Sequence, residues 1–108
     1  MSDLLTDDQA RIKAWERVNL AIAIADLEWT VVLAKNTLEE AEKRQAFTRS
    51  TERFQYWEHY FERCKNVGFF TLDNPFAERA EADKAVDKAV DDLGRAEYKL
   101  RKLREREA

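Results

Sequence analysis

The chain has 108 residues, of which 44% are hydrophobic and 38% are charged, and its formal net charge is −3. This composition is too apolar for disorder and fits long helices with wide solvated faces, and the mild negative charge disfavours simple electrostatic binding to nucleic acid or anionic membrane. Because two glycines and one proline are too few for the turns of a sheet, we expect an all-α chain folding as one domain over residues 1–108. Two long helices with a short one between them are expected to form either a three-helix bundle or an extended helical hairpin.

The first predicted helix covers about residues 7–47. Thr6 can cap its start, and Gln9 completes a Thr-x-x-Gln capping box. Asp7 and Asp8 follow in the first turn, where carboxylates interact favourably with the helix dipole. No breaker interrupts the pattern over this range, so the helix is expected to be roughly 60 Å long.

Two apolar stripes lie on roughly opposite sides of this first helix. One stripe consists of Leu20, Ile24, Leu27, Val31, Ala34, Leu38 and Ala41. The other consists of Trp15, Val18, Ile22, Ala25, Trp29 and Leu33. Three arrangements are possible: the two remaining helices cover opposite faces of the first, the tryptophans are only partly buried, or a second molecule covers one face. We favour the second molecule, because exposed aromatic patches usually mark interaction sites. The candidate interaction residues on this face are Trp15, Ile22, Trp29 and Leu33.

A short aromatic-rich helix is predicted next, over about residues 51–67. Thr48, Ser50 and Thr51 can each cap it, so the link from the first helix is either a sharp turn or a kink. Gly68 fits the position just past its end.

One stripe of this short helix is mostly aromatic. Its members are Phe54, Trp57, Phe61 and Cys64. Because aromatic rows at helical spacing are usually part of a core, we expect these side chains to be buried, with Cys64 acting as a small hydrophobe.

The third predicted helix covers about residues 75–106, with Asn74 as its N-cap and Pro75 as its first residue. Its early turns are acidic and its late turns are basic, as the helix dipole prefers. Phe69 and Phe70 lie in the connector before it. We expect them to plug the end of a bundle; the alternative is that they anchor a partner.

Small and aliphatic residues form a narrow heptad seam on the third helix. They are Ala82, Val86, Ala89, Leu93, Ala96, Leu100 and Leu103. This seam packs either on the first helix or on a second copy. Gly94 costs about 1 kcal/mol of helix stability relative to alanine, and it would permit close approach of a neighbouring helix. Asp83, Asp87 and Asp91 make an acidic ridge, which is either a solvated face or a site for a basic partner.

No catalytic, cofactor-binding or metal-binding residues are expected. His59 and Cys64 are the only residues of their types, so they cannot assemble a di-iron or zinc site, and on one helix they point in different directions. Two isolated glycines cannot form a phosphate-binding loop. The lone cysteine excludes an intrachain disulfide. Without a signal-like start or a long apolar stretch, a cytoplasmic protein with no membrane contact is expected.

The leading hypothesis is a non-enzymatic helical module that forms a homodimer through the first helix, the third helix or both, and docks a protein partner. One alternative is a small acidic inhibitor or decoy, a class that includes phage-encoded proteins, which blocks a basic, nucleic-acid-binding partner through the acidic ridge. A second alternative is binding of single-stranded nucleic acid by aromatic side chains with interleaved basic residues. Those basic residues are Arg44, Arg49, Arg53, Arg63 and Lys65. The acidic net charge makes nucleic acid the least favoured partner.

Overall fold

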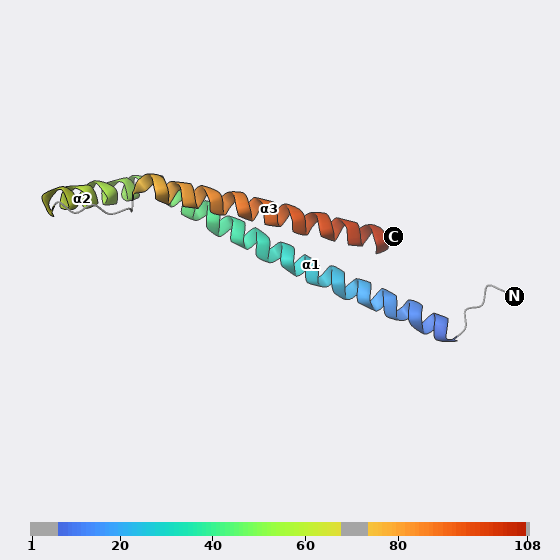
Figure 1. Ribbon diagram of the computed structural model, residues 1–108. Helices are drawn as coiled ribbons and strands as arrows, with labels where there is room; N and C mark the ends of the chain where they lie inside the picture. Colours follow the sequence, from blue (N-terminus) through green and yellow to red (C-terminus); the bar gives the residue numbers. More distant parts are fainter. Residues whose placement is uncertain (1–6, 68–73, 108) are drawn as a thin grey trace.

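The computed structural model describes residues 7–67 and 74–107, which form three α-helices in a long, short, long order (Figure 1). Helix α1 runs over Asp7–Thr48, α2 over Thr51–Val67 and α3 over Pro75–Glu107. The all-α prediction is confirmed, and so is the order of two long helices with a short one between them. Each helix boundary lies within one residue of its predicted position.

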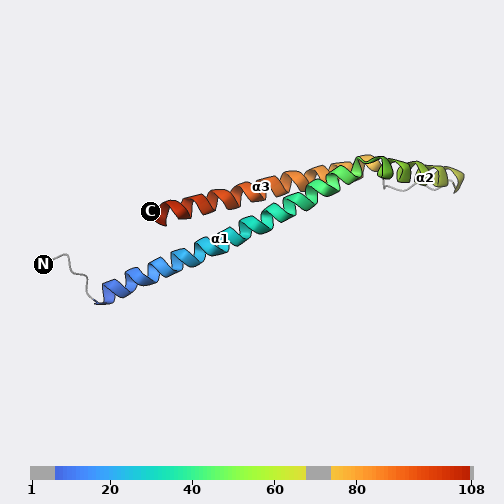
Figure 2. The same cartoon turned by 180° about the vertical axis from the view of Figure 1, so that it is seen from behind.

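Helices α1 and α3 lie side by side in opposite directions, and α2 continues away from them beyond the end of this hairpin (Figures 1 and 2). The molecule measures 91 × 22 × 14 Å, with a radius of gyration of 25.0 Å. A compact domain of this length has a radius of gyration of roughly 13 Å. Of the two alternative architectures, this elongated shape fits the extended hairpin.

The link between α1 and α2 is a two-residue kink. The backbone N–H groups of Arg49 and Ser50 donate to the carbonyls of Ala46 and Phe47, which tightens the last turn of α1. Ser50 Oγ then accepts from the backbone N–H of Arg53 at 3.2 Å, so Ser50 is the N-cap of α2. These bonds let α2 start in a new direction immediately after α1 ends.

The start of α3 follows the predicted capping chemistry. Asn74 Oδ1 accepts from the backbone N–H of Ala77 at 2.8 Å, and Pro75 takes the first helical position. Four predicted features, the Thr6 cap, the Gly68 position past the end of α2 and the side chains of Phe69 and Phe70, lie outside the described residues.

The core is the line of contact between α1 and α3, where the first apolar stripe of α1 meets the heptad seam of α3. Its buried members are Ile24, Val31, Ala96 and Leu100, packed against Leu20, Leu27, Leu93 and Leu103. Ala82 and Ala89 are also buried on α3, where their small side chains allow close helix approach. The seam of α3 is thus used within the chain.

The aromatic stripe of α2 is buried at one position instead of four. Trp57 is 7% exposed, but Phe54 and Phe61 are 56% and 49% exposed, and Cys64 is half-buried. The prediction of a buried aromatic row was wrong because α2 lies beyond the hairpin. Only the side of α2 that faces the start of α3 is covered.

Replacing Leu100 with alanine tests whether the α1–α3 contact holds the fold. Leu100→Ala removes a buried side chain from the contact between α1 and α3. The free energy of unfolding should therefore fall by about 2 kcal/mol, which is near the low end for leucine-to-alanine changes in a core, because two packed helices enclose the side chain less than a full core does. Urea unfolding followed by circular dichroism measures it. Lys99→Ala, on the exposed side of the same turn, should leave the midpoint nearly unchanged. Equal effects of the two substitutions would contradict this placement of the core.

Gly94 was predicted to permit close helix approach, but it is exposed and a Cβ added there meets no atom within 4 Å. Since the position is inside α3, Gly94→Ala should raise the free energy of unfolding by about 0.5–1 kcal/mol through helix propensity alone. The same urea titration measures this gain. A loss of stability would show that another surface lies against Gly94.

Candidate protein-docking surface

The second apolar stripe of α1 is exposed along its length. Trp15 is 65% exposed, Trp29 is 63% exposed, and Ile22 and Leu33 are about half exposed at 54% and 47%. Soluble monomers rarely leave a contiguous apolar patch of this kind in water, and such patches usually mark interaction sites. We call these residues, with Ile12, Val18, Ala25 and Val32 beside them, the outer face of α1.

The outer face is open because, among the described residues, α3 is the only helix that packs along α1. Helix α3 covers the side of α1 that carries Ile24 and Val31, and residues spaced as Trp15, Ile22 and Trp29 point the opposite way on a helix of 3.6 residues per turn. Helix α2 lies beyond the hairpin, so it covers none of this face (Figure 2). The alternative in which α2 and α3 flank α1 on both sides is not the one formed.

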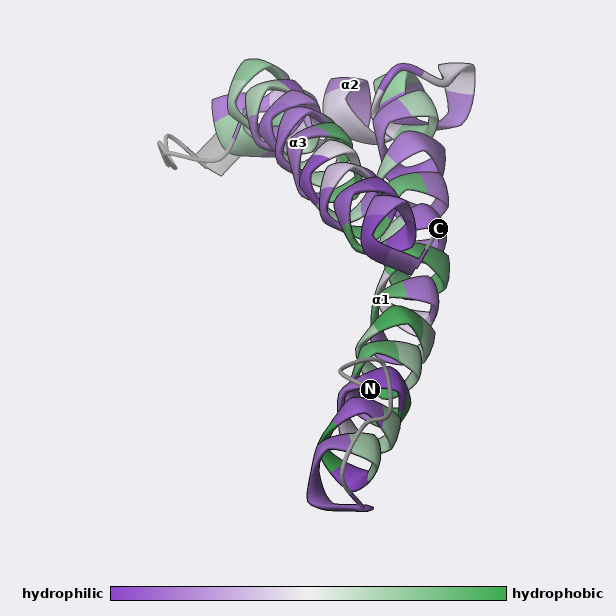
Figure 3. Ribbon diagram, turned by 90° about the vertical axis from the view of Figure 1, so that its right-hand side faces the viewer, coloured by the Kyte–Doolittle hydropathy of each residue, from purple (hydrophilic) through white to green (hydrophobic). Residues whose placement is uncertain are grey.

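The part of α1 nearest its N-terminus is the most open. It extends past the C-terminal end of α3 (Figure 1), and hydrophobic turns of α1 are visible clear of α3 in Figure 3. Sequence reasoning identified most of the outer face but missed Ile12 and Val32, which are 57% and 44% exposed. The apolar spacing in the sequence does indicate Val32, because this residue continues the alternating steps of three and four residues from Trp29.

The total accessible surface supports this description. The chain exposes 9050 Å² for a mass of 12.7 kDa. A compact monomer of that mass exposes roughly 6,200 Å². The surplus exceeds the roughly 800 Å² that each partner contributes to a standard protein interface, so the molecule has ample surface for a large interface.

Two shallow grooves run along the sides of the α1–α3 contact. One is lined by apolar and charged side chains of both helices, including Val32, Lys35, Tyr98 and Arg101. The other lies near the open end of the hairpin and includes Leu20 and Leu103 with basic neighbours. Such open grooves suit contact with another helix better than enclosure of a small molecule.

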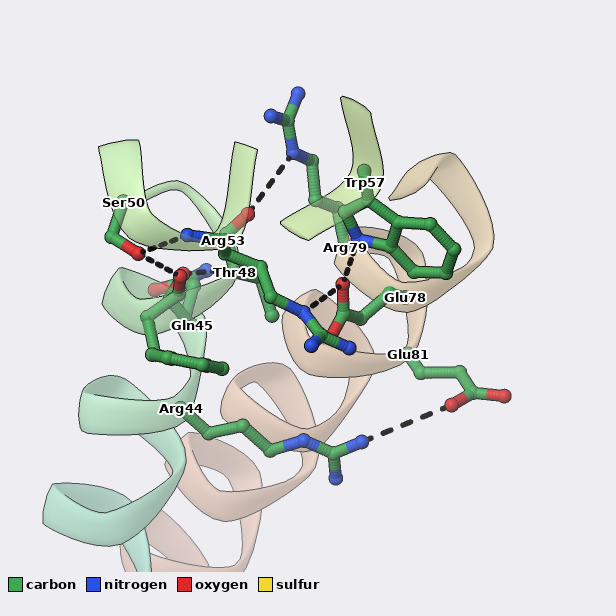
Figure 4. Close-up of polar contacts among 10 residues, drawn as sticks. Arg44, Gln45, Thr48, Ser50, Arg53, Trp57, Glu78, Arg79 and Glu81 are labelled. Carbon is green, nitrogen blue, oxygen red and sulfur yellow. Dashed lines mark hydrogen bonds and ion pairs between the residues drawn. The ribbon is translucent and has the colours of Figure 1, made fainter. Parts of the chain in front are cut away.

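A polar cluster joins α2 to α3 at the opposite end of the molecule (Figure 4). The Glu78 carboxylate accepts from Arg53 Nε at 2.8 Å and from Trp57 Nε1 at 2.7 Å, and a second guanidinium nitrogen of Arg53 lies 2.7 Å from it. The Arg53 guanidinium stacks over the Tyr56 ring at 4.1 Å. Nearby, Arg79 Nε donates to the carbonyl of Thr48 at 3.4 Å.

This cluster shifts the titration of both charged partners. The hydrogen bond from Arg53 is the main cause that lowers the pKa of Glu78, and burial opposes it. The same bond raises the pKa of Arg53. The pair is mostly buried, with 22% and 17% of the two side chains exposed. Because little water reaches the two side chains, the strength of the Arg53–Glu78 ion pair depends on how the kink positions them.

The acidic ridge of α3 is partly engaged within the chain. Asp83 accepts from Arg49 at 2.9 Å and from Gln45 Nε2 at 2.8 Å, and these two bonds lower the pKa of its carboxyl. Asp87 and Asp91 are exposed. The structure thus leaves two of the three predicted ridge residues open toward solvent, and it ties the third to the end of α1.

Three of the basic residues considered for nucleic-acid binding also have acidic partners on α3. Arg53 pairs with Glu78, Arg49 pairs with Asp83, and Arg44 lies 3.9 Å from Glu81. Their charge is largely compensated within the chain, which leaves less for contacts to phosphates.

Few groups that could carry catalysis or hold a metal come together in the described part of the chain. His59 is exposed on α2, and Cys64 is half-buried on the same helix. Residues 7–67 and 74–107 contain no group of three or more His, Cys, Asp or Glu side chains placed to hold a metal ion. Over those same ranges, no helix has both the length and the apolar character needed to cross a membrane.

Comparison with models of known protein families, with curated protein sequences and with solved structures finds no significant match to this chain.

Neutralising Glu78 tests whether the polar cluster holds α2 to α3. Glu78→Gln keeps the shape but removes the charge that Arg53 and Trp57 bind, so the free energy of unfolding at pH 7 should fall by about 1–2 kcal/mol. Urea unfolding measures the change. Glu81→Gln is the matched control, because the exposed Glu81–Arg44 pair should contribute less than about 0.5 kcal/mol. Equal effects at the two positions would contradict a special role for Glu78.

The lowered pKa of Glu78 also predicts a pH dependence. Its charge stabilises the folded chain fully above the ordinary glutamate pKa of about 4.3, and this contribution is lost as pH falls through the lower folded value. The stability difference between the native chain and Glu78→Gln should therefore be full at pH 7 and shrink below about pH 4. Urea midpoints for both proteins between pH 3 and pH 7 measure it. A difference that grew at low pH would contradict the assignment.

Proposed function

We propose that this protein is a non-enzymatic helical interaction module, which self-associates and docks a protein partner through the outer face of α1. The observation that carries the proposal is the exposure of Trp15 and Trp29 on one side of a long helix whose other side forms the only core among the described residues. Aromatic side chains dominate the energy of protein interfaces when they become buried.

The intrachain contacts narrow the choice of surface. The heptad seam of α3 already packs against α1, with Ala96 and Leu100 buried there. Of the two helices considered for self-association, we favour α1, because its second apolar stripe is still open. The acidic ridge offers a weaker surface, because Asp83 is bound by Arg49 and Gln45.

Light scattering on the native chain and on two variants tests the proposal. At tens of micromolar the native chain should have the mass of a dimer. Trp29→Glu places a charge in the interface, so it should weaken association at least about 30-fold, as expected for loss of an interface hot spot. Because Trp29 is exposed in the protomer, the variant should keep its helical circular dichroism.

Glu58→Lys is the control for this experiment. Glu58 is exposed on α2, which lies beyond the hairpin and away from the outer face, so its reversal should change association little. A native chain that is monomeric at tens of micromolar would contradict self-association. Binding of an immobilised native chain to a cellular protein that Trp29→Glu fails to retain would support the docking role, and equal retention by both would contradict it.

A further inference from the structure

We propose that a second copy of this chain covers the outer face of α1, and that the two α1 helices pack antiparallel around a two-fold axis between residues 23 and 24. This inference rests on the proposed self-association and specifies its geometry. The size, spacing and charge of the residues on the outer face support it, together with the surface that the protomer leaves open.

The outer face has the spacing of a coiled-coil seam. Alternating steps of three and four residues place six apolar side chains on one line, and the five largest of them are at least 44% exposed. The six are Trp15, Val18, Ile22, Ala25, Trp29 and Val32. Their span from Trp15 to Val32 is about 26 Å along the helix axis, which is long enough for a helix–helix interface.

An antiparallel arrangement places large side chains opposite smaller ones in every layer. Each core position of one helix then faces the complementary core position of the other. The three layers, each repeated by the two-fold axis, are Trp15 against Val32, Val18 against Trp29, and Ile22 against Ala25 of the second copy. Alternation of large and small residues across facing positions is what fills a helix interface without voids or strain.

A parallel arrangement fits the same residues poorly. It would place Trp15 against Trp15 and Trp29 against Trp29, while Ala25 would face Ala25. Overfilled layers would then alternate with an underfilled one, and both errors destabilise a packed interface. The parallel form would gain an exposed Lys35–Glu40 pair, but exposed ion pairs contribute little.

The residues that flank the seam also favour the antiparallel over the parallel arrangement. In the antiparallel form Ile12 lies beside Leu33 of the second copy, so two exposed apolar side chains cover each other. In the parallel form Leu33 would instead lie beside Glu28 of the second copy. Glu28 already binds Arg104 of its own chain at 3.2 Å, and an apolar neighbour would cost it solvation without a compensating bond.

The antiparallel seam also has natural ends. The next layer outward pairs Arg11 with Asn36 of the second copy, and the one beyond it places Asp8 opposite Glu39. Polar and then like-charged layers stop the apolar contact at both ends. Because α3 occupies the opposite side of α1, the dimer would stack α3, α1, α1 and α3 in one layer of helices.

This geometry fixes the shape of the dimer. The two α2 helices would lie at opposite ends, each about 55–60 Å from the axis, which gives a particle roughly 110–120 Å long. A parallel dimer would keep both α2 helices at one end and stay near the 91 Å length of the protomer. Small-angle X-ray scattering of the full chain, at a concentration where light scattering shows a dimer, separates the two lengths.

Disulfide formation provides an independent test in a Cys64→Ser background. The double variant Ile12→Cys/Leu33→Cys should form covalent dimers on mild oxidation, because the antiparallel form brings positions 12 and 33 of different copies together. The control is Val32→Cys alone. The two thiols at position 32 would be about 25 Å apart in the antiparallel dimer and adjacent in a parallel dimer. The antiparallel form therefore predicts no covalent dimer of this variant.

The outcomes separate this inference from the function on which it rests. A particle of 110–120 Å with disulfides only in the 12/33 variant would support the antiparallel dimer. A dimer near 91 Å with disulfides through Val32→Cys would overturn the antiparallel geometry and leave self-association intact. A chain that stays monomeric would overturn both.

Discussion

The organisation of this molecule depends on a single line of contact between two long helices. Two helices can bury only the sides that face each other, so Ile24, Val31, Ala96 and Leu100 form a core with no third layer. Along the hairpin, the sides of α1 and α3 that point away from this contact stay exposed in the protomer. The open aromatic face of α1 and the elongated shape are consequences of this one constraint.

The long contact between α1 and α3 and the end of the hairpin at the kink are stabilised by different chemistry. Along its length the contact is apolar, and small alanines on α3 let the helices approach closely. At the kink, where α2 leaves the hairpin, the contact is polar and depends on Glu78 binding both Arg53 and Trp57. A carboxylate held by several charge-assisted bonds fixes direction as well as distance, so this cluster sets where α2 points.

Helix existence and boundaries could be predicted from the sequence because caps and apolar periodicity are local properties. Asn74 with Pro75, the first stripe of α1 and the seam of α3 all act as their spacing indicates. The exposure of Phe54 and Phe61 could not be predicted, because it depends on where α2 is placed. That placement follows from the two-residue kink and from the Arg53–Glu78 pair, which joins residues 25 positions apart.

The three tryptophans fall into two environments, and this gives the chain its own optical labels. Trp57 is buried at the kink with its indole N–H bound to Glu78, whereas Trp15 and Trp29 lie in water on the outer face. Indole emission shifts to shorter wavelength when the ring leaves water. Covering the outer face would therefore change the fluorescence of two rings, and opening the kink would change that of the third. The intrinsic fluorescence of the unlabelled protein can thus follow two separate structural events.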